Sequence, residues 1–196
     1  GLLAIGGDVE VDSLLLAYSS GIFPWPIGPQ TLAWFSPSKR AVFFLEDLHL
    51  PRRLLREAKK PCYEFAMNRD FASVIQGCAE ADNRKGPGGT WITKSIVDGY
   101  KALHKAGYCH SFECYQDGEL IGGIYGVQIQ NFFGGESMFY RKSNASKLAF
   151  LLLRDYLQSQ QISWVDCQVL KQLLLTWQHA VHAVYHHFLL PGLLVI

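Results

Sequence analysis

Residues 109–140 constrain the fold more than any other part of the chain. They contain three strand-like segments, "CHSFECYQ", "LIGGIYGVQIQ" and "NFFGGESMFYR", separated by short turns. The Asp117-Gly118 pair between the first two is typical of a tight hairpin. A strongly helical segment, "SNASKLAFLLLRDYLQSQQ", and an apolar segment, "ISWVDCQVL", follow them. Three strands, a helix and a further strand predict an α+β arrangement.

The part of the chain before residue 109 mixes helices and strands. We expect a helix capped by Asp12 and ending near Gly21, a second helix within residues 47–61 with Pro51 near its first turn, and further helices over residues 69–81 and 92–107. The Pro- and Trp-rich stretch before the strand at 40–45 is expected to be an ordered loop. We predict a small N-terminal α/β domain over residues 1–62 and a larger domain over residues 63–196.

Composition narrows the class of protein. The chain has 196 residues, 49% of them hydrophobic, and a net charge of +1, which argues against a protein that coats nucleic acid. Its five cysteines show no CxxC spacing, so we predict neither a disulfide framework nor a metal site. No signal peptide, membrane span or P-loop is visible, which favours a cytoplasmic protein without a nucleotide cofactor. Since the chain does not begin with Met, we expect it to lack its native start.

Two carboxylates stand among apolar residues. Glu136 lies within "FFGGESMF", and Asp166 lies within "WVDCQVL" with Gln168 two positions later. If that segment is a strand, Asp166 and Gln168 leave the same face, and pairing near Glu136 would gather two carboxylates and an amide that could orient an amine and take its proton. The alternative is that each carboxylate caps a turn or pairs with an arginine such as Arg141 or Arg154.

Two further features could bind a ligand. The stretch with Pro24-Trp25-Pro26 and Trp34 is stiff and aromatic, as the walls of ligand sites often are, although core packing is the commoner role of such rings. One segment is densely basic, with Arg52, Arg53, Arg56, Lys59 and Lys60. It is either a solvated helix face or a contact to a phosphate backbone.

Several of these blocks together resemble one family. The chain contains, in order, "GLLAIGGD", "AYSSGIFPW", "WFSPSKRAV", "GTWITKSIVDGY", "GGIYGV", "GGESMFYRKSNASK" and "DCQVL". In this order they are similar to the bacterial leucyl/phenylalanyl-tRNA–protein transferases, from residue 1 to about Leu170. The resemblance implies a GNAT-like acyltransferase fold for the larger domain. It also implies transfer of Leu or Phe, and possibly Met, from aminoacyl-tRNA to the N-terminal Arg or Lys of proteins, marking them for degradation. We expect a monomer that needs no cofactor or membrane.

The resemblance also implies roles for particular residues. Asp166 and Gln168 would act on the incoming α-amine, supported by Glu136. The aminoacyl-adenosine would lie near Tyr18, Trp25, Trp91 and Tyr100. The side chain of Leu or Phe would enter an apolar pocket formed by Ile124, Phe133 and Met138. The basic segment would hold the tRNA acceptor arm.

The resemblance ends after Leu170. Residues 171–196 read "KQLLLTWQHAVHAVYHHFLLPGLLVI", which differs from the family pattern, and we expect this tail to be out of register with the family. A catalytically impaired homologue that binds tRNA or protein N-termini is therefore one alternative. A Fem-type aminoacyl-tRNA-dependent ligase is another, although such an enzyme should lack the "GIFPW" and "GTWIT" blocks.

Overall fold

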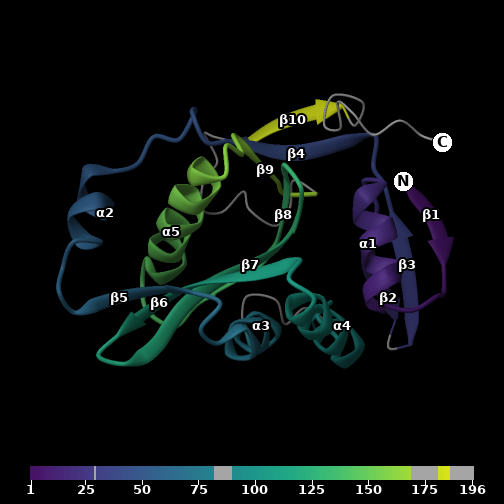
Figure 1. Cartoon of the computed structure of the whole chain (residues 1–196), viewed down its shortest axis with the longest axis horizontal. Helices are drawn as coiled ribbons and strands as arrows, with labels where there is room; N and C mark the ends of the chain where they lie inside the picture. The colour runs from purple at the N-terminus through teal and green to yellow at the C-terminus, as the bar shows by residue number, and fades with distance from the viewer. Residues whose placement is uncertain (29, 82–89, 169–180, 186–196) are drawn as a thin grey trace.

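The structure, a computed structural model, describes residues 1–28, 30–81, 90–168 and 181–185 (Figure 1). Its helices are α1 (Val11–Ser19), α2 (Arg52–Glu57), α3 (Phe71–Glu80), α4 (Lys94–Lys105) and α5 (Ala145–Ser159). Its strands are β1 (Leu2–Ile5), β2 (Phe23–Gly28), β3 (Thr31–Phe35), β4 (Lys39–Phe44), β5 (Tyr63–Met67), β6 (Cys109–Gln116), β7 (Glu119–Ile129), β8 (Phe132–Tyr140), β9 (Trp164–Asp166) and β10 (Val181–Tyr185).

The strands form two sheets. Within the described residues, the large sheet has seven strands in the order β10-β4-β9-β8-β7-β6-β5, and the small sheet has three in the order β1-β3-β2. The three strands predicted between residues 109 and 140 are β6, β7 and β8, and the turn at Asp117-Gly118 joins the first two. Helix α5 covers one face of the large sheet, and α3 and α4 cover the other (Figure 1). The chain is therefore a mixed α/β protein, as predicted.

The prediction that the Pro- and Trp-rich stretch forms a loop is wrong. Strands β2 and β3 pair antiparallel in this stretch, with Pro24 opposite Trp34 and Trp25 opposite Ala33. Proline cannot donate a backbone hydrogen bond, which argues against a central strand. Because β2 is an edge strand, Pro24 and Pro26 are compatible with it.

Two predicted elements begin or end at other residues in the structure. Helix α1 begins at Val11 after Glu10, so Asp12 does not cap it; instead the Asp8 carboxylate accepts bonds from the Glu10 N–H at 3.1 Å and the Ser13 hydroxyl at 2.7 Å. The strand predicted over 162–170 ends at Asp166.

The domain boundary predicted after residue 62 stays a prediction. Strand β4, on the N-terminal side of that boundary, pairs with β9 in the large sheet. Of the predicted atypical tail, residues 171–196, the structure describes only β10, which pairs with β4; the rest lies outside the described residues. In the part of the chain that is described, no helix is long and apolar enough to cross a membrane.

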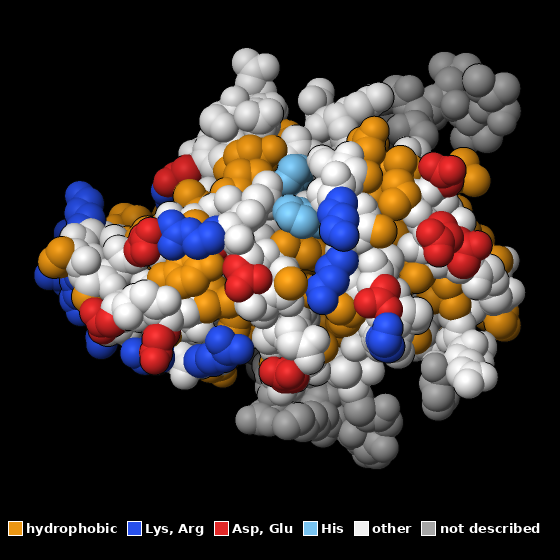
Figure 2. All heavy atoms as spheres, turned by 60° about the horizontal axis from the view of Figure 1, so that its bottom comes forward, with side chains coloured by type: hydrophobic (Ala, Val, Ile, Leu, Met, Phe, Trp, Pro, Cys, Tyr) orange, Lys and Arg blue, Asp and Glu red, His pale blue; other side chains and the backbone are white. Residues whose placement is uncertain are grey.

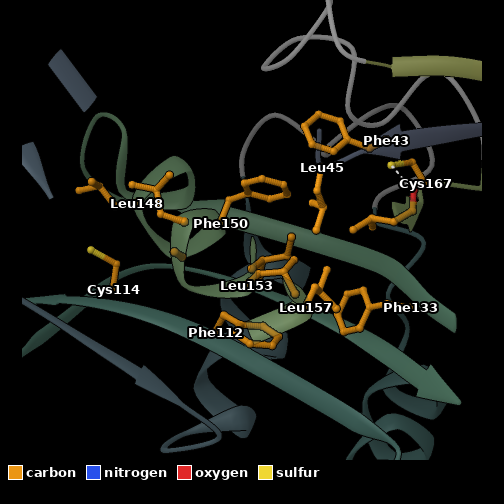
Figure 3. Close-up of a cluster of buried hydrophobic side chains, with 14 of the residues drawn as sticks. Phe43, Leu45, Phe112, Cys114, Phe133, Leu148, Phe150, Leu153, Leu157 and Cys167 are labelled. Atoms are coloured by element: carbon orange, nitrogen blue, oxygen red, sulfur yellow. Dashed lines mark hydrogen bonds between the residues drawn. The ribbon is translucent and has the colours of Figure 1, made fainter. Parts of the chain in front are cut away.

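Buried apolar side chains form two clusters, one on each face of the large sheet. The first lies under α5 and includes Phe112, Phe133, Leu153 and Leu157 (Figure 3). The second lies among α1, α3, α4 and the opposite face, and includes Leu14, Ile75, Ile96 and Tyr125. The two clusters hold the small N-terminal elements and the large sheet in one packed arrangement.

A glycine allows the close approach of α4 to the chain before α1. A Cβ at Gly99 would lie 2.5 Å from the backbone oxygen of Val9 and 2.8 Å from its side chain. Real Cβ atoms essentially never come so close to backbone. The absence of a side chain at Gly99 therefore brings Tyr100 on α4 next to Tyr18 on α1.

Gly99→Ala should destabilise the protein. At an ordinary helix site this substitution stabilises by about 1 kcal/mol through helix propensity, but here overpacking against Val9 should win and cost about 1–3 kcal/mol. Urea denaturation measures the free energy of unfolding. Lys101→Ala on the same helix is the control and should change stability little; a stabilising Gly99→Ala would contradict the packing.

Candidate active site

Glu136 lies at a β-bulge between β7 and β8. Gly126 pairs with Gly135 and Tyr125 pairs with Ser137, so Glu136 is the extra residue and has no partner across the ladder. Its side chain lies on the same face as Phe132 and Gly134, because a Cβ on Gly134 would lie 3.5 Å from Oε1 of Glu136. A bulge interrupts the alternation of side chains along a strand. Beyond the bulge, Met138 therefore packs against the first cluster, on the face covered by α5.

Three side chains from separate elements lie within hydrogen-bond distance of the buried Glu136 carboxylate, which is 3% exposed. Tyr18 of α1 and Gln168, which follows β9, both donate to Oε1 at 2.7 Å. The Tyr100 hydroxyl of α4 lies 3.3 Å from Oε2 and also contacts the Tyr18 hydroxyl, and its single proton is donated to one of these two oxygens. These donors replace the water that a carboxylate loses on burial.

The environment of Glu136 favours its protonated form. Burial raises its pKa from an ordinary 4.5 to about 7, and the nearby Asp166 charge adds to the rise, while the hydrogen bonds from Tyr18, Gln168 and Tyr100 oppose it. Burial, followed by the charge of Glu136, also raises the pKa of both tyrosines. Both stay neutral donors, and Glu136 is the group in this cluster that can exchange a proton near neutral pH.

Asp166 pairs with an arginine other than Arg141 or Arg154. Arg40, at the start of β4, forms a buried ion pair with it through Nη2 and donates from Nε to Oδ1 at 3.1 Å. Arg141 and Arg154 contact other groups. Arg40 is a site residue that the sequence analysis misses, although it shows the same signal as Glu136: a charge at the edge of an apolar run, "RAVFF".

Gln168 reaches Glu136 from a turn rather than from a strand. Its backbone is left-handed, with φ of 60°, and its N–H donates to Oδ1 of Asp166 at 2.8 Å. The expectation that Asp166 and Gln168 share a strand face is therefore wrong, because the strand ends before Gln168. The structure nevertheless brings the Gln168 amide to Glu136 and fixes it through Asp166.

Of the four residues expected near the aminoacyl-adenosine, two stack and two belong to the Glu136 cluster. The indole rings of Trp25 and Trp91 are parallel within 12°, with centroids 5.0 Å apart, and both are partly buried. Tyr18 and Tyr100 are buried and bond to Glu136 as described. All four pack in or against the second apolar cluster.

The three residues expected to form an apolar pocket lie on the opposite face of the sheet. Ile124 and Phe133 are buried in the first cluster, and Met138 packs against it. Figure 3 shows Phe133 beside Leu157 and close to Phe112, whose ring centroid is 6.1 Å away. In this structure these side chains do not border the Glu136 carboxylate on its own face.

The basic segment is fully on the surface. Helix α2 is short, from Arg52 to Glu57, and Lys59 and Lys60 follow it. All five basic side chains, those of Arg52, Arg53, Arg56, Lys59 and Lys60, are exposed. Figure 2 shows Lys and Arg side chains gathered at the end of the molecule where Figure 1 places α2.

Glu136→Gln should remove a pH dependence of stability. Between pH 4.5 and about 7 the folded state keeps the Glu136 proton that the unfolded state has released, so the wild type loses stability as pH rises through this range. This loss is on the order of 3 kcal/mol for a shift of this size. Urea denaturation at pH 5 and pH 8 should show it in wild type and in the exposed control Glu119→Gln, but not in Glu136→Gln. Parallel curves for wild type and Glu136→Gln would contradict this.

Known proteins are similar to the chain along most of its length. The family model described as leucyl/phenylalanyl-tRNA protein transferase matches residues 42–188, and the model of that family's N-terminal domain matches residues 7–38. A leucyl/phenylalanyl-tRNA–protein transferase of Saccharophagus degradans is 45% identical over 89% of this chain and 71% of its own. One of Chromobacterium violaceum is 46% identical over 86% and 72%.

A crystal structure of FemX has a similar fold. The similarity covers 91% of this chain and 68% of that chain, with a TM-score of 0.53 at 11% sequence identity, and shows the fold alone. The sequence matches go further, because an identity near 45% over most of the chain is shared with named transferases. The chain belongs to the leucyl/phenylalanyl-tRNA–protein transferase family of aminoacyltransferases.

Proposed function

We propose that the chain transfers leucine or phenylalanine from aminoacyl-tRNA to the N-terminal Arg or Lys of an acceptor protein. The observation that carries the proposal is the buried cluster of Glu136, Gln168, Tyr18 and Tyr100 in a member of this transferase family. Because charged tRNA is the donor, the activity is cytoplasmic. The product N-terminus would mark the acceptor for degradation, as the family resemblance implies.

The proposed reaction is attack of an amine on an ester. The nitrogen of the acceptor α-amine forms a bond to the carbonyl carbon of the aminoacyl ester, and the bond from that carbon to the ribose oxygen breaks. The amine loses one proton, and the leaving ribose oxygen gains one. The ester is already activated, so the protein must orient the two reactants and move a proton.

Glu136 is the proposed proton acceptor. A pKa of about 7 leaves it partly ionised near neutral pH, which suits a general base. Asp166 suits that role less well, because its charge is already paired with the buried guanidinium of Arg40. We assign Gln168 to hold the amine and Asp166 to hold Gln168.

Other residues are assigned to substrate recognition. The stacked Trp25 and Trp91 offer flat apolar surface for the terminal adenosine. The pocket expected from Ile124, Phe133 and Met138 receives no assignment, because these side chains pack on the α5 face of the sheet, away from the Glu136 carboxylate. A cleft of about 580 Å³ is lined in part by Asp8 and Glu10, whose negative charges favour a cationic acceptor.

Transfer of labelled leucine tests the proposal. Purified protein, labelled Leu-tRNA and a peptide beginning with Arg should give labelled peptide. Glu136→Gln should lower kcat by about 100-fold or more, as removal of a general base does. Gln168→Ala and Asp166→Ala should lower kcat similarly through lost orientation.

The exposed Glu119→Gln and a peptide with an acetylated N-terminus are the controls. The first should retain activity, and the second should accept no label because it lacks the attacking amine. Binding of tRNA without transfer by the wild type would instead identify an impaired homologue. Full activity in Glu136→Gln would exclude Glu136 as the base.

Charge reversal on the basic segment should weaken tRNA binding. Exposed cations that contact phosphates release counterions on binding, so Arg53→Glu with Arg56→Glu should lower the affinity and reduce the slope of log K against log salt by about 1–2. The measurement is a tRNA-binding titration at several salt concentrations.

Lys101→Glu with Lys105→Glu is the matched control. These residues lie on α4, on the opposite face of the large sheet from α5. An unchanged salt slope after reversal of Arg53 and Arg56, or an equal loss in the control, would contradict a specific role of the basic segment.

A further inference from the structure

Arg40 has one of the most enclosed charged side chains in the described chain, at 3% exposure. Its guanidinium uses all three nitrogens: Nε and Nη2 contact the Asp166 carboxylate, and Nη1 donates to the backbone oxygen of Gly21 at 3.1 Å. The guanidinium carbon also lies 5.0 Å from the ring centroid of Phe23. Such a planar fork with several fixed partners has one orientation.

The ion pair is a poor source of stability. Removing two charges from water costs free energy that their attraction barely repays, and apolar replacements of buried pairs are often neutral or stabilising. Asp166 is 1% exposed, so this cost applies in full. A geometric role explains the pair better than a contribution to stability.

The contacts of Arg40 join the two sides of the Glu136 cluster. Gly21 follows the end of α1, the helix that carries Tyr18, and Asp166 accepts the Gln168 N–H. Tyr18 and Gln168 donate to the same oxygen of Glu136. The position of Arg40 therefore sets how these two donors meet.

We propose that Arg40 is a positioning residue for aminoacyl transfer, which acts through Asp166 to hold the Gln168 turn against Glu136. The proposal rests on the proposed function. Arg40 touches neither the reacting atoms nor Glu136. It holds Asp166, which accepts the Gln168 N–H, and the Gln168 side chain contacts Glu136. A displacement of about 1 Å at a reacting centre can lower a rate by about 100-fold.

Arg40→Lys is the first variant. It keeps the positive charge beside Asp166 but loses the fork that also reaches Gly21. The measured kcat should fall about 10–100-fold, whereas KM for aminoacyl-tRNA should change less than about threefold. Arg154→Lys, which alters the pair with Asp155 on α5, is the matched control and should leave both constants unchanged.

A double-mutant cycle tests whether Arg40 acts through Asp166. In an Asp166→Asn background, Arg40→Lys should lower kcat by less than about threefold, because the ion pair between residues 40 and 166 is already lost. Equal losses in both backgrounds would overturn the proposal, as would a wild-type kcat in Arg40→Lys. Transfer rates are normalised to the folded fraction from circular dichroism, so that unfolding does not imitate a loss of positioning.

Hydrogen exchange supplies a readout that does not need activity. The Gln168 amide should exchange about tenfold faster in Arg40→Lys, since its acceptor has moved. The neighbouring Cys167 amide, which donates to the backbone oxygen of Ala41 at 2.8 Å, is the internal control and should not change. Unchanged exchange at Gln168 would overturn the proposal. If the wild type transfers no leucine, the proposed function fails, and the exchange result still decides whether Arg40 holds Gln168.

Discussion

The Glu136 carboxylate, buried out of water, is the constraint on which the site depends. A buried negative charge needs hydrogen-bond donors, and the fold supplies them from α1, α4 and the turn after β9. Each element must therefore stand in one position relative to β8. The glycine at position 99 serves this requirement, because it allows α4 with Tyr100 to approach the chain next to α1, which carries Tyr18.

Two neighbouring acids have their charges balanced in different ways. Asp166 faces the fixed positive charge of Arg40, which makes it a structural anion. The hydrogen bonds to Glu136 come from neutral hydroxyl and amide groups, and burial raises its pKa to about 7. A carboxyl group whose pKa lies near neutral pH is typical of sites that move protons.

Local sequence patterns predict much of the fold, and they also explain why two predictions were wrong. The Asp117-Gly118 turn and the alternation on either side of it predicted β6 and β7. The apolar surroundings of Glu136 and Asp166, with Gln168 two positions later, marked these residues as candidates, and the family resemblance implied their roles. The prediction of a loop over the Pro- and Trp-rich stretch was wrong. Proline argues against a strand that is paired on both edges, but β2 is an edge strand. The strand prediction at Gln168 failed because the carboxylate of Asp166 captures the next available N–H and ends the strand.

The sequence by itself determined which residue types occur, where the central hairpins turn and to which family the chain belongs, because these depend on neighbouring residues or on whole motifs. Only the tertiary structure decided that Tyr18 meets Glu136 across 118 positions and that Arg40 meets Asp166 across 126. No local periodicity encodes such pairs, since the partners are selected by the packing of α1 and β4 against the sheet. The bulge at Glu136 shows the same limit, because one extra residue in the ladder puts Phe133 and Met138 on the same face, which strict alternation would not do.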